Sequence, residues 1–177
     1  MTDNTPTPIR SMTVRMGMAM VRTPEKKRYD RRDGPVAKKF TATRSVVIEA
    51  EPADVWAALT DPELVSQAFF GAKVDTDWQV GSPITFSGEW QGKPFQDKGE
   101  IVKVEPNKVL QFTHFSPMAG QPDVPENYHT VTFKLMPSNG ATELTISQSN
   151  AGSEEERKHS EDNWAQVLKS FKQVAER

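Results

Sequence analysis

The chain has 177 residues, of which 36% are hydrophobic, a size that suits one domain with an appendage. It contains no cysteine, which excludes disulfide bonds, thiolate metal sites and a cysteine nucleophile. Its net charge of −2 combines +6 over residues 1–40 with −8 over residues 41–177, and so acidic a domain is a poor surface for nucleic acid. No apolar run approaches the roughly 20 residues of a membrane span, and with the lack of cysteine this leads us to expect a cytoplasmic protein.

Residues 1–39 differ in texture from everything that follows them. They are rich in proline and basic residues, and the stretch 25–33 is almost entirely charged. Few of these side chains could offset the entropy of ordering by burial, so we expect a disordered basic extension over 1–39 and a folded domain over 40–177. The alternative for the basic residues of the extension is a weak contact with nucleic acid or another anionic surface.

The domain opens with a strand and two short helices. Residues 40–50 are rich in β-branched side chains and predict a strand. Pro52 suits the first turn of a helix over 52–60, and Asp61 with Pro62 predicts the N-cap and first position of a second helix. Two helices placed back to back in this way predict a V-shaped pair.

Alternating apolar and polar residues then predict a meander of strands. The expected strands are 84–90, 96–104, 110–114, 127–136 and 144–148. The expected connections are turns at 91–94, 105–108 and 138–140 and a proline-rich loop over 115–125.

The last element is an amphipathic helix. Ser153 and Glu156 match a capping box, and a wide apolar stripe follows from Trp164 to Ala175. The order of elements therefore predicts an α+β domain. It would have a curved antiparallel sheet of about six to seven strands, two short helices after the first strand, and a long C-terminal helix of about five turns packed across the sheet.

Several local stretches carry a family resemblance over residues 40–177. They are Ile48–Glu63 (IEAEPADVWAALTDPE), the Phe69-Phe70 pair, Gly99–Pro106 (GEIVKVEP) and Asn163-Trp164. With them the chain resembles the START-like, Bet v 1-like (SRPBCC) superfamily, and within it the homologues of the activator of the 90-kDa heat-shock protein ATPase (AHSA1-like). The resemblance implies a helix-grip fold with a hydrophobic cavity and an association with the stress response. The chain departs from the family at Phe69-Phe70, where relatives usually carry tryptophan, and at residues 148–150, Gln-Ser-Asn in place of His-Ser-Gly; both positions are expected near the cavity.

A cavity between sheet and helix would be lined by side chains from both. The candidate ligand-binding residues are Val55, Trp56, Phe69, Phe70, Phe86, Trp90, Leu110, Phe112, His114, His129, Val131, Leu144, Trp164, Leu168 and Phe171. The alternative is that these side chains close up as ordinary core. His114 and His129 are either polar contacts for a ligand, able to act as acid or base, or histidines satisfied within the sheet.

No catalytic motif stands in the sequence. There is no Gly-x-Ser-x-Gly elbow, no glycine-rich phosphate loop and no His-x-x-x-His spacing, so we assign no catalytic residue, metal or cofactor. We expect a non-enzymatic domain that binds a small apolar or aromatic molecule. Two alternatives stay open. One is a cyclase- or aromatase-like enzyme that uses His114 or His129, and the other is a regulatory protein whose partner is a heat-shock chaperone.

Overall fold

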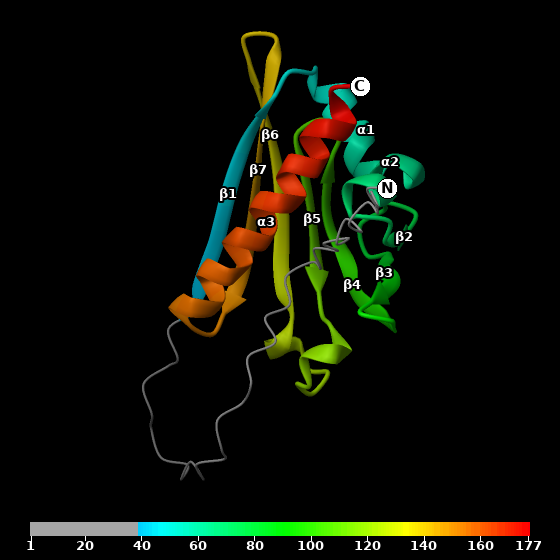
Figure 1. Ribbon diagram of the computed structural model, residues 1–177, viewed down its shortest axis with the longest axis vertical. Helices are drawn as coiled ribbons and strands as arrows, with labels where there is room; N and C mark the ends of the chain where they lie inside the picture. Colours follow the sequence, from blue (N-terminus) through cyan, green and yellow to red (C-terminus); the bar gives the residue numbers. More distant parts are fainter. Residues whose placement is uncertain (1–38) are drawn as a thin grey trace, which may run out of the picture.

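The computed structural model describes residues 39–177, so the predicted extension lies almost wholly outside the described residues. The strands form one seven-stranded antiparallel sheet in the order β1-β7-β6-β5-β4-β3-β2 (Figure 1). The elements are β1 Phe40–Ile48, α1 Pro52–Thr60, α2 Pro62–Ala68, β2 Lys73–Asp75, β3 Pro83–Trp90, β4 Lys93–Glu105, β5 Val109–His114, β6 His129–Ser138, β7 Ala141–Ala151 and α3 Glu154–Ala175. The predicted helix-grip architecture is thereby confirmed.

The two short helices begin where local chemistry places them. Asp61 is the N-cap of α2, and its carboxylate accepts hydrogen bonds from the backbone N–H groups of Glu63 and Leu64 at 2.9 and 3.1 Å. These bonds satisfy two of the donors that a helix start leaves free. Val55 and Leu59 of α1 are buried, so the helical pair closes one end of the space beneath the sheet.

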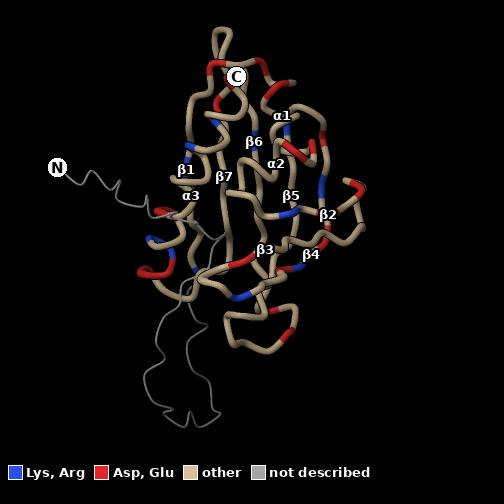
Figure 2. The backbone as a smooth tube through the Cα atoms, turned by 45° about the vertical axis from the view of Figure 1, so that its right-hand side comes forward, with Lys and Arg blue, Asp and Glu red and all other residues tan. Residues whose placement is uncertain are grey.

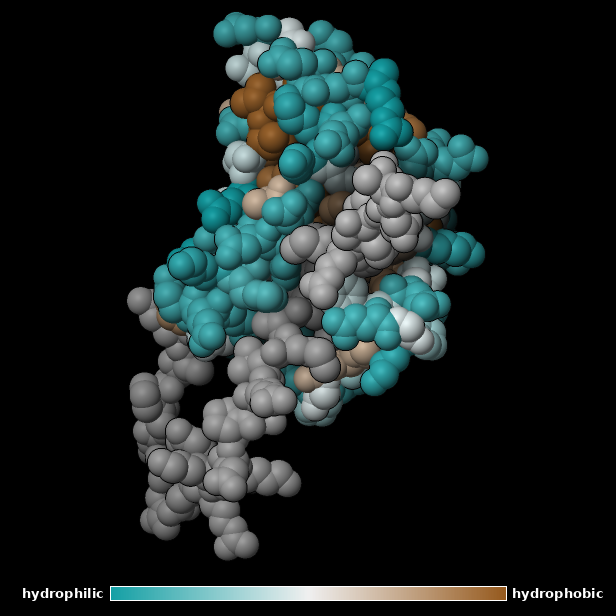
Figure 3. Space-filling view, viewed as in Figure 1, coloured by the Kyte–Doolittle hydropathy of each residue, from teal (hydrophilic) through white to brown (hydrophobic). Residues whose placement is uncertain are grey.

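The long helix α3 lies across the inner face of the sheet and contacts β1, β7, α1 and α2 (Figure 1). Ser153 Oγ accepts the N–H of Glu156, which confirms half of the predicted capping box, while Glu156 Oε2 accepts the N–H of Gly152. With 22 residues the helix has about six turns, one more than expected. Its apolar stripe is buried, whereas its outward surface is hydrophilic (Figure 3). Within residues 39–177 no helix is both long and apolar enough to cross a membrane.

The strand boundaries correct three details of the prediction. The turn between β3 and β4 takes only Gln91 and Gly92, both at positive φ, so the expected four-residue turn is wrong and β4 runs from Lys93 to Glu105. The short strand β2 has too few residues to show an alternating pattern, and it was not predicted. The turn of the β6–β7 hairpin takes only Asn139 and Gly140, with φ of +48° and +83°, whereas the expected turn over 138–140 included Ser138, which ends β6.

Strands β4 and β5 approach each other unusually closely at Gly99. A Cβ atom added to Gly99 would lie 1.6 Å from the carbonyl oxygen of Thr113. The register of the two strands also shifts between Ile101 and Lys103, which marks a β-bulge. Only glycine fits this position, because any side chain would have to push the backbone of β5 away.

We therefore expect Gly99→Ala to lower the free energy of unfolding by about 3 kcal/mol, through the backbone shift that the added methyl group forces. Urea denaturation measures the loss. Gly152→Ala is the matched control, because there the added Cβ meets only the flexible Glu156 side chain at 3.2 Å, and its cost should stay below about 0.5 kcal/mol. Equal losses in the two variants would contradict the close approach of the strands.

Candidate functional site

The inner face of the sheet carries a continuous series of aromatic contacts. Phe69 meets Phe86 and Phe171 at centroid distances of 5.9 and 5.2 Å, and Phe86 meets Phe112 at 5.5 Å. Phe133 extends the series to Phe112, Trp164 and Phe171 at 6.3, 6.1 and 5.7 Å. The candidate residues found within this buried apolar cluster are Val55, Phe69, Phe86, Leu110, Phe112, Val131, Leu144, Trp164, Leu168 and Phe171, with Trp56 packed against it.

Two of the aromatic candidates lie apart from this cluster. Phe70 follows α2 in a left-handed conformation with φ of +54° and is 37% exposed. Trp90 is half-buried at the end of β3, beside the hairpin turn. Neither residue therefore belongs to the group that the fold brings together.

A buried polar cluster ends the aromatic series. His114, the last residue of β5, packs its ring against Phe86 at 5.9 Å. Its Nε2 lies 3.2 Å from Oδ2 of Asp97 on β4, and Ser116 Oγ donates a hydrogen bond to Oδ1 of the same carboxylate. The three polar side chains are at most 5% exposed. Because the carboxylate is an acceptor, this contact places the ring proton of His114 on Nε2.

His129 stands beside this cluster as the direct cross-strand partner of His114. Directly opposed residues point to the same face of a sheet, so both histidines lie on the inner face. His129 Nδ1 donates to the carbonyl oxygen of Ser149 at 2.8 Å. Burial lowers the pKa of His129, with the nearby His114 and Lys39 adding to the effect, while the Ser149 carbonyl and the Glu156 carboxylate oppose it. The ring is therefore neutral at pH 7, with its proton on Nδ1.

Gln148 and Trp164 join the sheet to α3 nearby. The indole Nε1 of Trp164 donates to Oε1 of Gln148 at 2.8 Å, and both side chains are buried. Of residues 148–150, which were expected near the cavity, Gln148 is buried against α3. The Asn150 amide instead donates to the carbonyl oxygens of Glu126 and Tyr128, and so holds the long loop between β5 and β6.

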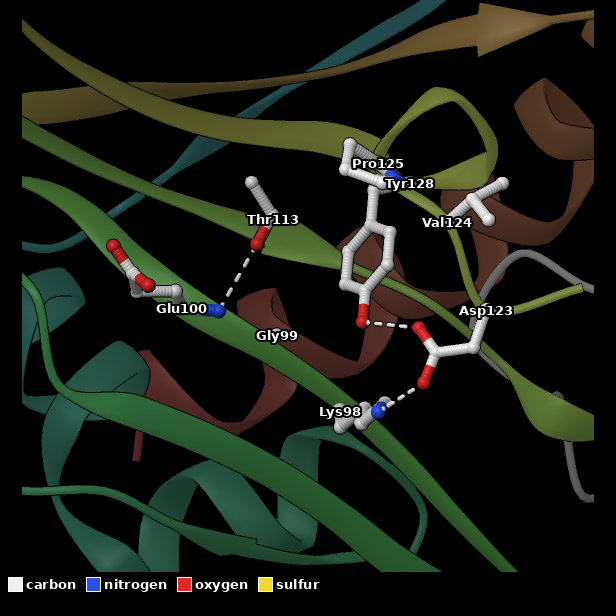
Figure 4. A pocket seen from close by; sticks show the side chains of 8 residues that line it. All are labelled: Lys98, Gly99, Glu100, Thr113, Asp123, Val124, Pro125 and Tyr128. Atoms are coloured by element: carbon white, nitrogen blue, oxygen red, sulfur yellow. Dashed lines mark hydrogen bonds and ion pairs between the residues drawn. The ribbon is translucent and has the colours of Figure 1, made fainter.

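That loop, residues 115–128, is fixed to the outer face of the sheet by a second polar network. Lys98 of β4 pairs with Asp123, and Tyr128 Oη donates to Asp123 at 2.8 Å (Figure 4). Burial and the bond to Asp123 raise the pKa of Tyr128, and the Lys98 ammonium holds the pKa of Asp123 below its usual range. A groove of about 400 Å³ lies along this network, lined also by Thr113 and Val124.

Two residues of the candidate site, Asp97 and Ser116, were not predicted from the sequence. Asp97 alternates with Gly99 and Ile101 on β4 and stands opposite Phe86 in the register, so it faces inward. A lone acidic residue at an inward position was the available signal. Ser116 lies just beyond β5 in the irregular loop, where no periodicity indicates which way a side chain points. Among residues 39–177 no group of three or more acidic or histidine side chains could hold a metal ion.

We expect Tyr128→Phe to accelerate amide hydrogen exchange in residues 115–128 several-fold, because the variant loses only the bond to Asp123. Tyr128→Ala should accelerate exchange further, since it also removes the stack on Phe115, whose ring lies 5.1 Å away at 23°. Exchange in β6 and β7 serves as the internal control. Unchanged exchange in both variants would contradict the role of this network in holding the loop.

Comparisons with known proteins agree with the fold and extend it to a family. No curated protein matches the chain. A solution structure from Cytophaga hutchinsonii is 43% identical, with a TM-score of 0.67, and the match covers 76% of this chain and 92% of that one. A Mesorhizobium loti crystal structure is 27% identical, with a TM-score of 0.63 and coverages of 76% and 96%. The Aha1 dimer of Colwellia psychrerythraea shares the fold at 21% identity, with a TM-score of 0.62 and coverages of 77% and 96%. The family model described as activator of Hsp90 ATPase homolog 1-like protein matches residues 49–176, and the chain belongs to that family.

Proposed function

We propose that the domain binds a small apolar or aromatic molecule between the inner face of the sheet and α3. The observation that carries the proposal is the buried Asp97–His114–Ser116 cluster at the end of the aromatic series. In this arrangement the aromatic rings contact the body of the ligand, and the cluster with His129 contacts its polar end. A largely apolar site with a few convergent polar groups is the usual form of a small-molecule site.

The energetics of the cluster support a role other than stability. Burying a carboxylate and an imidazole removes both from water, and the attraction between them offsets that loss only in part. Apolar side chains of similar shape at Asp97, His114 and Ser116 would serve a structural core equally well. A polar cluster set against aromatic rings is therefore better explained by a ligand than by the fold.

The direct test is a thermal-shift panel of neutral aromatic compounds, flavonoids and lipids on the full chain. A ligand present at 100 times its Kd stabilises the folded state by about 2.7 kcal/mol, which raises the Tm of a domain of this size by roughly 5–10 °C. Isotope-labelled NMR spectra should show the largest changes at residues of β4, β5 and α3. No shift across the panel, together with a crystal structure in which the aromatic rings close completely on one another, would refute the proposal.

Substitution of the cluster separates binding from stability. We expect Asp97→Ala alone to lower the free energy of unfolding by about 3 kcal/mol, because two buried groups lose their acceptor. The combined variant Asp97→Leu, His114→Phe, Ser116→Ala should stay within about 1.5 kcal/mol of the wild type in urea denaturation, yet lose the ligands found in the panel. If the combined variant binds them as the wild type does, the cluster is not the site.

A second candidate function is acid–base catalysis, favoured by the hydrogen bond between Asp97 and His114. A carboxylate that orients an imidazole is a common device for proton transfer. The arrangement does not suit a serine nucleophile, since the Ser116 hydroxyl donates to the Asp97 carboxylate. Mass spectrometry of a panel ligand recovered after incubation with the protein distinguishes the two functions, since a pure binding domain returns the ligand unchanged. Association with a heat-shock chaperone stays a prediction that rests on family membership.

A further inference from the structure

On the inner face of the sheet, beside the Asp97–His114–Ser116 cluster, His129 presents a hydrogen-bond acceptor. Because Nδ1 of this neutral ring donates its proton to the Ser149 carbonyl, Nε2 carries a lone pair. Within residues 39–177, Nε2 of His129 has no hydrogen-bond partner. The backbone contact thus fixes both the tautomer and the chemical character of the free nitrogen.

His114 offers a second nitrogen beside the first. Its Nε2 faces the Asp97 carboxylate, so in the tautomer with its proton on Nε2 the other nitrogen, Nδ1, is an acceptor. The part of the chain that the structure describes provides no partner for Nδ1, although the residue is only 3% exposed. A buried polar atom without a partner costs about 1–3 kcal/mol, so a group that donates to it is favoured.

The charges around the two histidines disfavour an anion. Asp97 is buried against His114, and the first turn of α3, which begins at this end of the sheet, carries Glu154, Glu155 and Glu156 (Figure 2). His114 and Lys39 both lower the pKa of His129 by their charge, and the Glu156 carboxylate opposes them. A carboxylate placed beside His129 would meet the like charges of Asp97 and Glu156 and the lone pair of His129 Nε2.

We propose that the ligand is a neutral aromatic molecule whose polar end is a hydroxyl group, and that this hydroxyl donates to His129 Nε2 or His114 Nδ1. The proposal rests on the proposed function and adds the chemical class of the ligand. The hydroxyl supplies the donor that the buried nitrogens lack, and the ring of the ligand continues the contacts of Phe86 and Phe112. An ether or a carboxylate of the same shape has no proton to donate.

Three matched probes test this chemistry by calorimetry on the full chain at pH 7.5: 4-propylphenol, 4-propylanisole and 4-propylbenzoate. They share the apolar body and differ in whether the polar end is a donor, an acceptor or an anion. One hydrogen bond to a buried nitrogen corresponds to about a tenfold change in Kd, so the phenol should bind at least about ten times more tightly than the ether. The benzoate should bind more weakly than the phenol.

Variants assign the preference to the histidine. His129→Phe should bring the affinities for phenol and ether within about threefold of each other, whereas the same substitution at the exposed His159 should leave the tenfold preference intact. If His129→Phe fails to fold, the ¹⁵N resonance of Nε2 in wild-type His129 provides the readout. The phenol should shift this resonance by donating a hydrogen bond to Nε2, and the anisole should leave it unchanged. Equal binding of phenol and ether, or tighter binding of the benzoate, would overturn the hydroxyl proposal and leave the proposed function standing. If the probes and the wider panel all fail to bind, the proposed function itself fails.

Discussion

The close approach of β4 and β5 at Gly99 is the constraint on which the polar end of the domain depends. Because Gly99 has no side chain, the Thr113 carbonyl of β5 can approach the backbone of β4 at this position. The same register pairs Ile101 with Phe112 and continues the apolar core, and the bulge follows between Ile101 and Lys103. Asp97, two residues before Gly99 on β4, consequently lies within hydrogen-bond distance of His114 at the end of β5. The arrangement is set by backbone geometry, and the polar residues occupy the positions that it offers.

Features encoded over a few neighbouring residues could be predicted from the sequence. The Asp61 cap, the Asn139-Gly140 turn and the apolar stripe of α3 each depend on local chemistry, and strand alternation put His114 and His129 on the apolar sides of their predicted strands. The partners of those histidines could not be predicted, because contacts with Asp97 and Ser149 depend on how strands far apart in the chain are aligned. The exposure of Phe70 follows from a left-handed backbone conformation that its sequence does not signal.

The inner face divides into two chemically different ends. Toward α1 and α2 it is closed by apolar side chains such as Val55 and Leu59, which are buried and make no demand for hydrogen bonds. Toward the start of α3 it carries a carboxylate and two imidazoles, while an acidic first turn of the helix stands outside. This difference in polarity would orient an elongated ligand of the proposed kind, with its apolar end toward α1 and α2. On the opposite face of the sheet, the Lys98–Asp123–Tyr128 network holds the loop between the strands that bear the histidines.

Because α3 buries Trp164 against the sheet, the fluorescence of this tryptophan reports whether the helix is docked. Trp164 is almost completely buried, whereas Trp56, Trp78 and Trp90 are each partly accessible to solvent. A buried indole in an apolar surrounding emits at shorter wavelength and is shielded from dissolved quenchers. The shielded fraction of the tryptophan fluorescence therefore measures how often α3 is seated on the sheet, without a label or a bound molecule.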